Sequence, residues 1–276
     1  MANIVVVNGE QYWQDYLPGH EVYFRRLQTS RWLLEKGRLF VRDASGALRV
    51  DAVLWRLGAV KPSNQHRAVL ELIRLAGIPC VNPARTLLRG YDRLSMMAEL
   101  KEAGLTVVPP VIGVGEHVLE GVEPGFPAVV KVGNFHGGAG KALVRDSEAW
   151  SDVKDMAFIT DDYITVEDYV PYVRDIRCLA VGGRMWAMSR RGARWKANMD
   201  TVHFDLIDVP EPLARQTATA MSHLKADILG LDFLEAPDGS FVLLESNDIP
   251  GLSGFPDETR QALAAIVRRK VETVAD

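Results

Sequence analysis

Two acidic residues near the end of the chain stand where apolar side chains are expected. Asp232 lies in the segment LDFLE and Glu245 in the segment FVLLES, with the turn-forming stretch PDGS between them. This pattern predicts a β-hairpin. A two-residue turn at Asp238-Gly239 would pair Pro237 with Ser240 and, farther out, Asp232 with Glu245. The Cβ atoms of the two acids would then lie about 5 Å apart on one face, where like charges repel.

A bound divalent cation would remove this repulsion. Asn247 lies two residues beyond Glu245 and therefore on the same face of the strand. Two carboxylates and an amide oxygen form an all-oxygen site, which suits Mg²⁺ or Mn²⁺. The sequence thus predicts Asp232, Glu245 and Asn247 as metal ligands. The alternative is a three-residue turn, which would shift the register and place the two acids on opposite faces.

A second informative stretch is FPAVVKVGNFHGGAGKALV, which starts at Phe126. A strand that carries Lys131 leads into a glycine-rich loop, 134–140, and Lys141 opens the next strand. Glycines let backbone N–H groups approach phosphates, and a lysine adds a positive charge. A strand follows the loop, so the stretch is neither a P-loop nor a dinucleotide fingerprint. The alternative is an ordinary flexible turn.

The third stretch, residues 166–200, places polar groups among strand-like segments. Arg177 stands inside an apolar strand, where a cation needs a partner. Lys196 and Asn198 would share a face if that segment is extended. The alternative for Arg190 and its neighbouring arginines is an ordinary solvated turn.

The secondary-structure elements that must position these residues follow two different patterns along the chain. Strands alternate with a helix over residues 3–82, which predicts a parallel sheet covered by helices. Hairpin-like strands dominate after residue 107, which predicts an α+β portion. The predicted strands are 4–7, 52–56, 78–82, 126–133, 141–145, 163–170, 176–183 and 184–191, and the predicted helices are 66–77, 91–104, 211–230 and 257–274.

Composition narrows the class of protein. The chain has 276 residues and a net charge of −4, and a general nucleic-acid binder would carry a basic surplus. Cys80 and Cys178 lie in apolar runs and are expected to be buried thiols in a reducing compartment. We find no membrane-spanning run and no basic leader, so we expect a cytoplasmic protein with neither nucleic-acid nor membrane partners.

Taken in order, the motifs resemble those of the ATP-grasp superfamily. They are most similar to the branch that holds ribosomal-protein glutamate ligases, lysine-biosynthesis ligases and synapsin. The quoted similarities run along nearly the whole chain: AGIPCVN, YDRLSMMAELKEAGL, VVKVGNFHGGAGK, VEDYV, RDIRC, WKAN and LLESN followed by PG. The resemblance implies an ATP-grasp fold of class α/β with an α+β C-terminal part. It implies a parallel-sheet lobe at 1–88 and an ATP-grasp domain at 89–276, divided into a lid (about 89–165) and an antiparallel-sheet subdomain (about 166–276).

The resemblance also implies roles for individual residues. ATP phosphates would be held by Arg93 and Lys131 under the loop glycines, adenine would lie in the 167–170 hinge, and Asp175 would lie near the ribose. Lys196, Asn198 and Arg177 would be catalytic, with Lys196 also near the transferred phosphoryl group. The implied nucleotide-binding residues are Arg93, Lys131, Gly137, Gly138, Gly140, Glu167, Asp168, Tyr169, Val170, Asp175 and Lys196.

Two departures from the family pattern bear on these roles. Arg93 stands where the family usually has a lysine; it keeps the charge but presents a planar fork. MDTVHFDL replaces a glycine-rich stretch that usually follows the Asn198 position and faces the acceptor.

The activity implied is an ATP- and Mg²⁺-dependent (or Mn²⁺-dependent) ligase that joins a carboxylate to an amine through an acylphosphate. The partners would be an amine and a small-molecule or peptide carboxylate, for which Arg56 is the candidate binding residue; a structural ion pair is the alternative for Arg56. Other readings are a synapsin-like ATP-binding regulatory protein with little catalysis, and transfer of phosphate to a hydroxyl. Homo-oligomers are common in the superfamily, and no segment predicts or excludes one.

Overall fold

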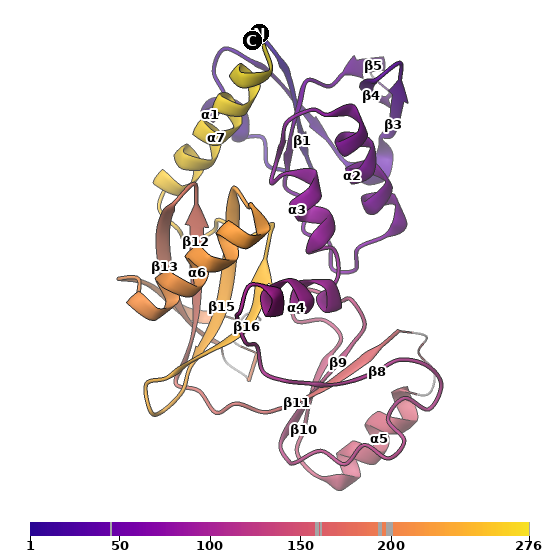
Figure 1. Cartoon of the computed structure of the whole chain (residues 1–276), viewed down its shortest axis with the longest axis vertical. Coiled ribbons are helices and arrows are strands. Elements are labelled where there is room, and N and C mark those ends of the chain that lie inside the picture. Colours follow the sequence, from indigo (N-terminus) through magenta and orange to yellow (C-terminus); the bar gives the residue numbers. More distant parts are fainter. Residues whose placement is uncertain (45, 158–159, 161, 193–194, 197–200, 276) are drawn as a thin grey trace.

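The computed structural model describes residues 1–275 except 45, 158–159, 161, 193–194 and 197–200. Three regions follow one another along the long axis of the molecule (Figure 1). A parallel-sheet lobe with the two chain termini lies at one end, an antiparallel sheet lies in the middle, and a smaller lid sheet lies at the other end. The predicted fold class, mixed α/β with an antiparallel C-terminal part, is confirmed.

The N-terminal sheet has the order β2-β1-β6-β7, and its strands are parallel. The side chains of its central strand alternate between two cores, as the period of a strand requires: Ile4 and Val6 pack with α1 and α7, whereas Val5 and Val7 pack with α2 and α3. Helices therefore cover both faces, as predicted. The elements are β1 (Asn3–Val7), α1 (Trp13–Tyr16), β2 (Glu21–Arg25), β6 (Ala52–Trp55), α2 (Asn64–Ala76), β7 (Cys80–Val81) and α3 (Ala84–Arg89).

An antiparallel β-meander lies beside this sheet and was not predicted. Its side chains Leu39, Val41 and Val50 join the core of α2. Helix α2 begins with a capping box at Ser63 and ends at Gly77 in the left-handed conformation (φ 67°), which confirms the predicted helix stop. The elements of the meander are the 3₁₀ turn η1 (Leu27–Thr29), β3 (Arg31–Glu35), β4 (Arg38–Asp43) and β5 (Gly46–Arg49).

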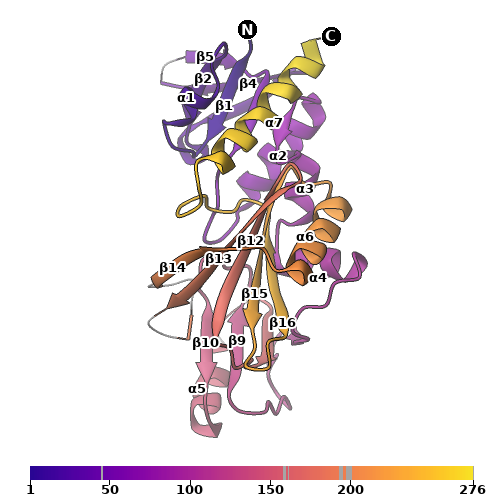
Figure 2. The same cartoon turned by 90° about the vertical axis from the view of Figure 1, so that its left-hand side faces the viewer.

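The lid is a four-stranded antiparallel sheet of order β10-β9-β11-β8 with helix α5 packed on it (Figure 2). The core under α5 contains Trp150 together with Val130 and Ile164. The hairpin-like pattern predicted β9, β10 and β11 but missed β8 and the helix. The elements are β8 (Val111–Gly113), β9 (Ala128–Val132), β10 (Lys141–Val144), α5 (Ser147–Ala157) and β11 (Ile164–Asp168).

The C-terminal sheet has the order β14-β13-β12-β15-β16 and is antiparallel throughout. Helices α4 and α6 pack on one face over Ile176, Cys178 and Phe233. The elements are α4 (Arg93–Glu102), β12 (Arg174–Val181), β13 (Arg184–Gly192), β14 (Thr201–Ile207), α6 (Glu211–Leu224), β15 (Ile228–Glu235), β16 (Phe241–Asn247) and α7 (Glu258–Ala275).

The prediction of one helix over 211–230 is wrong at its C-terminal end. Helix α6 stops at Leu224, because Lys225 takes a left-handed conformation (φ 53°), and Ile228 to Gly230 open strand β15. These residues are buried: Ile228 packs in the core shared with the N-terminal lobe, and Leu229 packs in the core under α4 and α6. Both cysteines are free and buried, as expected. None of the described helices is long and apolar enough to cross a membrane.

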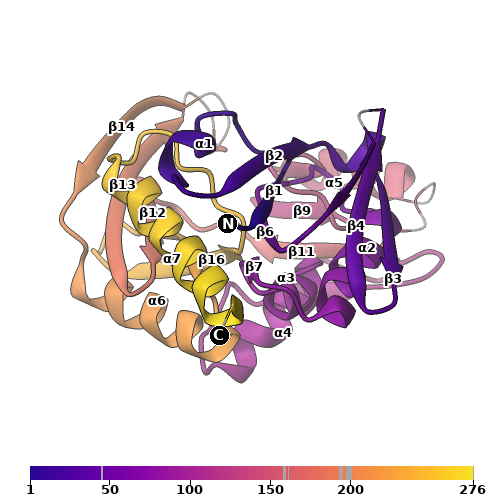
Figure 3. The same cartoon turned by 90° about the horizontal axis from the view of Figure 1, so that it is seen from above.

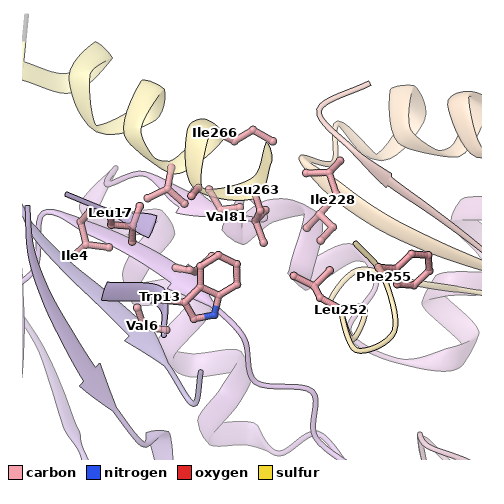
Figure 4. Close-up of a cluster of buried hydrophobic side chains, with 14 of the residues drawn as sticks. Ile4, Val6, Trp13, Leu17, Val81, Ile228, Leu252, Phe255, Leu263 and Ile266 are labelled. Atoms are coloured by element: carbon pink, nitrogen blue, oxygen red, sulfur yellow. The ribbon is translucent and has the colours of Figure 1, made fainter. Parts of the chain in front are cut away.

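Helix α7 joins the two larger regions. It contacts α1, β6 and β7 of the N-terminal lobe and β12 of the C-terminal sheet (Figure 3). Leu263 and Ile266 of α7 pack in one buried cluster with Trp13 of the first lobe and Ile228 of the second (Figure 4). The lobes are thus held together by a shared core, while the domain boundaries at residues 88 and 165 stay predictions.

Asn82 reinforces this junction by hydrogen bonds. It is 1% exposed, and its amide nitrogen donates to the carbonyls of Ile228 (2.7 Å) and Asp248 (2.6 Å). Its amide oxygen accepts from the backbone N–H groups of Asp227 (2.6 Å) and Ile228 (2.8 Å). One side chain after β7 therefore fixes both the start of β15 and the segment that follows β16.

Candidate active site

The hairpin β15–β16 brings Asp232 directly opposite Glu245, as the sequence predicts. The predicted two-residue turn is nevertheless wrong, because Ala236 pairs with Ser240 and three residues form the loop. That register alone would separate the two acids. The register shifts by one residue between Asp232 and Phe233, with Leu244 as the extra residue on β16. This β-bulge restores the pairing of the acids.

Asp232 lies in a network of cross-strand ion pairs. Arg177, opposite it on β12, donates Nε to Oδ1 (2.7 Å) and a terminal nitrogen to Oδ2 (2.6 Å). Arg190 on β13 donates to Oδ1 of Asp232 (3.0 Å) and to Asp175, which lies opposite Arg190 (Nε to Oδ1, 2.7 Å). Arg190 is 8% exposed, so its assignment to a solvated turn is wrong.

The network shifts the pKa values of its acids in opposite directions. Burial raises the pKa of Asp175 to about 6; the Asp232 carboxylate adds to this effect and Arg190 opposes it. Burial would also raise the pKa of Asp232, but Arg177 and Arg190 outweigh it and hold this pKa below its usual value. Asp232 is therefore ionised at neutral pH.

Glu245 has looser partners. Its Oε2 lies 3.5 Å from Nζ of Lys141 and 3.4 Å from a terminal nitrogen of Arg93. Burial would raise the pKa of Glu245, but Lys141, Arg93 and Lys131 together hold it far below its usual value. Arg93 also donates to the carbonyl of Phe135 in the glycine-rich loop (2.7 Å). Arg93 thus joins this loop to Glu245.

The donor set fits a divalent cation. Asp232 and Glu245 are ionised and face one another, and Oε1 of Glu245 accepts no hydrogen bond that we find from the described residues. Asn247 lies on the same face, and its Oδ1 accepts one bond, from the N–H of Ile249 (3.0 Å). An amide oxygen has two lone pairs and a carboxylate about four, so acceptor capacity remains. The charge repulsion that suggested the metal is, however, already balanced by arginines and lysines of the chain.

Seven of the eleven implied nucleotide-binding residues line one cavity between the lid and the C-terminal sheet: Lys131, Glu167, Asp168, Tyr169, Val170, Asp175 and Lys196. Arg93 and Gly137 line a second cavity instead, and Gly138 and Gly140 line neither one in the described part of the chain. Lys131 of β9 and Glu167 of β11 lie on the wall of the first cavity as a buried ion pair, with Nζ 2.6 and 2.5 Å from the two carboxylate oxygens. Lys196 donates to the carbonyl of Gly138 (3.0 Å). The first cavity is lined by Val108, Val129, Lys131, Lys141, Glu167, Asp168, Tyr169, Val170, Tyr172, Asp175, Trp195, Lys196, Asp232, Leu234, Leu244 and Glu245.

The glycine-rich loop approaches this cavity and also contacts the N-terminal lobe. Gly137, Gly138 and Gly140 all have positive φ, and a Cβ at Gly140 would lie 3.0 Å from the carbonyl oxygen of Val132, so a side chain there would be crowded. The N–H of His136 donates to the carbonyl of Val60 (2.7 Å). The loop is therefore held against the first lobe.

A second cavity, of about 320 Å³, lies between the N-terminal lobe and the sheet. Glu245 lines it as well, so the two cavities meet at this carboxylate. Arg177 and Arg190 also face it. Its lining residues are Trp55, Leu57, Gly58, Ala59, Val60, Pro62, His66, Leu70, Leu87, Gly90, Tyr91, Arg93, Met96, His136, Gly137, Arg177, Arg190, Glu245, Ser246, Asn247, Asp248 and Ile249.

Three residues stand apart from the predicted pattern. Arg56 donates to the carbonyl of Pro250 (2.8 Å) and lies over Trp13, and it does not line either cavity in the described part of the chain. Asn198 lies outside the described residues. Asp248 was missed by the sequence reasoning, although it lines the second cavity and burial raises its pKa to about 7. Its position directly after the LLESN motif was the available signal.

Comparison with known proteins identifies the family. A family model described as the ATP-binding domain of synapsin matches residues 115–273, which is more than half of the chain. The chain belongs to this family. The ATP-grasp resemblance seen in the motifs is thereby confirmed.

Relatives of this synapsin-family chain include named ligases. A probable α-L-glutamate ligase of Marinomonas sp. (strain MWYL1) is 26% identical over 245 residues, covering 84% of this chain and 80% of the relative. A glutamate–LysW ligase, ArgX, of Sulfurisphaera tokodaii is 25% identical over 209 residues, covering 71% and 74%.

Solved structures share the fold over nearly the whole chain. A RimK-domain ATP-grasp protein of Sphaerobacter thermophilus has a TM-score of 0.70 at 20% identity, covering 97% of this chain and 100% of the other. D-alanyl-alanine synthetase A of Vibrio cholerae has a TM-score of 0.72 at 13% identity, covering 99% and 98%. The chain therefore has the ATP-grasp fold.

Proposed function

We propose that this protein is an ATP-dependent carboxylate–amine ligase that works through an acylphosphate and releases ADP and phosphate. The observation that carries the proposal is that Glu245 lines both cavities. One cavity is lined by seven of the residues implied for ATP, and the other would take a second substrate. The phosphate end of ATP and an acceptor could therefore meet beside one carboxylate. The ligase names of the two relatives support the same conclusion.

In the first proposed step, a carboxylate oxygen of the substrate attacks the γ-phosphorus of ATP. The bond from phosphorus to the β–γ bridging oxygen breaks, and ADP leaves with that oxygen. The anions gathered here need cations, which Lys131 and Lys196 would supply on the nucleotide side and Arg93 would supply beside Glu245, where the two cavities meet. Arg177 and Arg190 face the second cavity, where they would orient the attacking carboxylate. Catalysis is then mainly positioning and charge stabilisation.

In the second step, the free-base nitrogen of the amine attacks the acyl carbon. The bond from that carbon to the phosphate oxygen breaks, phosphate leaves, and the surplus proton on nitrogen passes to solvent. Asp232, Glu245 and Asn247 would hold Mg²⁺, which would neutralise phosphate charge. The apolar wall of Trp55, Leu57 and Leu70 would keep water away from the activated carbonyl.

Trapping with hydroxylamine tests the proposal. The purified protein is given ATP, Mg²⁺, hydroxylamine and pools of amino acids, dicarboxylic acids or peptides, with glutamate tested first because both relatives are named for it. A ligase forms a hydroxamate and releases ADP and phosphate together, only when the correct carboxylate is present. Arg56→Ala is compared with Arg49→Ala, at an exposed arginine, to test whether Arg56 binds that carboxylate. Release of ADP without phosphate would instead indicate transfer to a hydroxyl and would refute the ligase.

The family match itself favours a second candidate, an ATP-binding regulatory protein similar to synapsin. Such a protein would bind ATP with Mg²⁺, and this binding would raise the melting temperature of the protein. It would form no hydroxamate with any acid. Tight ATP binding without product from any pool is the result that would favour it.

A further inference from the structure

Asp248 is positioned at the second cavity by a glycine. It follows β16 directly, and a Cβ built on Gly90 would lie 2.9 Å from its Oδ2. Gly90 has φ −87° and ψ 12°, which any L-residue adopts, so the backbone does not require glycine here. What the missing side chain provides is room for the Asp248 carboxylate. Both residues line the cavity.

Asp248 also differs from the other acids at the two cavities in its ion-pair partners. Each of the other acids there that is not exposed has a cation beside it: Glu167 has Lys131, Asp175 has Arg190, Asp232 has Arg177, and Glu245 has Lys141 and Arg93. For Asp248 we find no ion pair among the described residues. Asp248 is partly buried. A carboxylate in such a place gains from a cation that a ligand brings.

Cations also line this cavity. Arg177 and Arg190 line it from the sheet, and although both donate to Asp232, an arginine has five N–H donors, so further donors could serve an anionic group. Leu57, Leu70 and Trp55 close the side formed by the N-terminal lobe. With a volume of about 320 Å³, the cavity has the size of a small-molecule site.

We propose that Asp248 binds the ammonium group of the amine substrate, so that the acceptor lies with its cationic end between Gly90 and β16. The inference rests on the proposed ligase function and adds a residue that selects the amine. Asp248 acts before the chemical step by concentrating the protonated amine. The ammonium then loses one proton to solvent, and the resulting free base attacks the acyl carbon. Neutral nucleophiles would not need Asp248.

Competition between a charged and an uncharged nucleophile tests the proposal. At neutral pH ethylamine is a cation, whereas hydroxylamine is mainly uncharged. With the carboxylate found by the trapping assay, ethylammonium chloride is titrated into the hydroxamate reaction. In the wild-type protein ethylammonium suppresses hydroxamate formation. In Asp248→Asn the concentration for half suppression rises about tenfold or more, because a charge-assisted hydrogen bond is lost, while the KM for ATP and for hydroxylamine stays unchanged.

Two further variants separate charge from folding. Gly90→Ala keeps the acid but pushes it out of place, so it also raises the concentration of ethylammonium needed. Ser246→Ala changes an uncharged side chain in the same cavity and leaves this concentration unaltered. Equal suppression in the wild type, Asp248→Asn and Gly90→Ala would overturn the role of Asp248 while the ligase function stands. A wild-type protein that forms no hydroxamate at all would overturn the ligase function and this inference with it.

Discussion

Replacing Asn82 with alanine tests how the two lobes are joined. The side chain donates two hydrogen bonds and accepts two, all with backbone groups of Asp227, Ile228 and Asp248. Alanine cannot replace any of these bonds. Two N–H groups and two carbonyls would then be left without this partner at a position that is 1% exposed.

The expected loss of stability is large. A buried polar group without a partner costs about 1–3 kcal/mol. The two bonds to Ile228 are buried and the other two are partly buried. The two Ile228 groups alone therefore give about 2 kcal/mol at the low end, and the partly buried groups and the lost packing add to this. A domain is stable by about 5–15 kcal/mol in total, so Asn82→Ala should lose a large fraction of the stability of the protein.

Urea unfolding followed by tryptophan fluorescence measures this loss, and the chain has six tryptophans. Asn3→Ala is the matched control, since the Asn3 side chain donates one exposed hydrogen bond, to the carbonyl of Arg49 (3.1 Å). We expect the control to change the unfolding free energy by less than about 0.5 kcal/mol. A difference below about 1 kcal/mol between the two variants would refute the reasoning.

Three further predictions concern single charges. Glu245→Gln should abolish Mg²⁺-dependent turnover and leave the circular-dichroism spectrum unchanged; normal activity would disprove the metal assignment. Lys131→Met should weaken ATP binding in calorimetry about tenfold or more, whereas Lys154→Met, at an exposed position, should not, and equal affinities would remove Lys131 from the site. Glu99→Gln should lower the unfolding free energy by about 1–3 kcal/mol at pH 7 while Glu102→Gln does not, because a hydrogen-bonded arginine lowers the pKa of Glu99. Because the folded-state pKa of Glu99 is lowered, its contribution to stability is fully present above the ordinary pKa of 4.5 and is lost as the pH falls through the folded-state pKa. The urea midpoints of the wild type and Glu99→Gln should therefore converge in acid. A difference that stays constant with pH would contradict this.

Much of the candidate site could be predicted from short patterns. Lys131, the glycine-rich loop and Glu167 each belong to a motif of a few consecutive residues. Such a motif can be recognised in one sequence without knowledge of the tertiary structure. The pairing of Asp232 with Glu245 was predicted from the hairpin, but on the wrong turn. The β-bulge at Leu244 restored the register, and the turn sequence does not predict a bulge farther along the strand.

Other parts of the site could not be predicted, because they depend on which strands become neighbours. From the sequence, Arg190 is predicted to be a surface residue. In the structure, β13 pairs with β12 and places Arg190 opposite Asp175. From the sequence, Asp248 is predicted only to lie in a loop. In the structure, Gly90, which is distant in the chain, leaves room for the Asp248 carboxylate. Contacts between such distant segments leave no periodic signal.

The sequence by itself determined most of the kinds of element and the ATP-grasp resemblance, because these depend on residue types a few positions apart; the nucleotide-binding roles that the resemblance implies stay predictions. Only the tertiary structure decided which charged side chains form ion pairs with one another. It paired Arg177 with Asp232, and it brought both cavities to Glu245. The physical reason is that a buried charge takes its partner from whatever strand packs beside it, and that strand is chosen by the burial of the whole core.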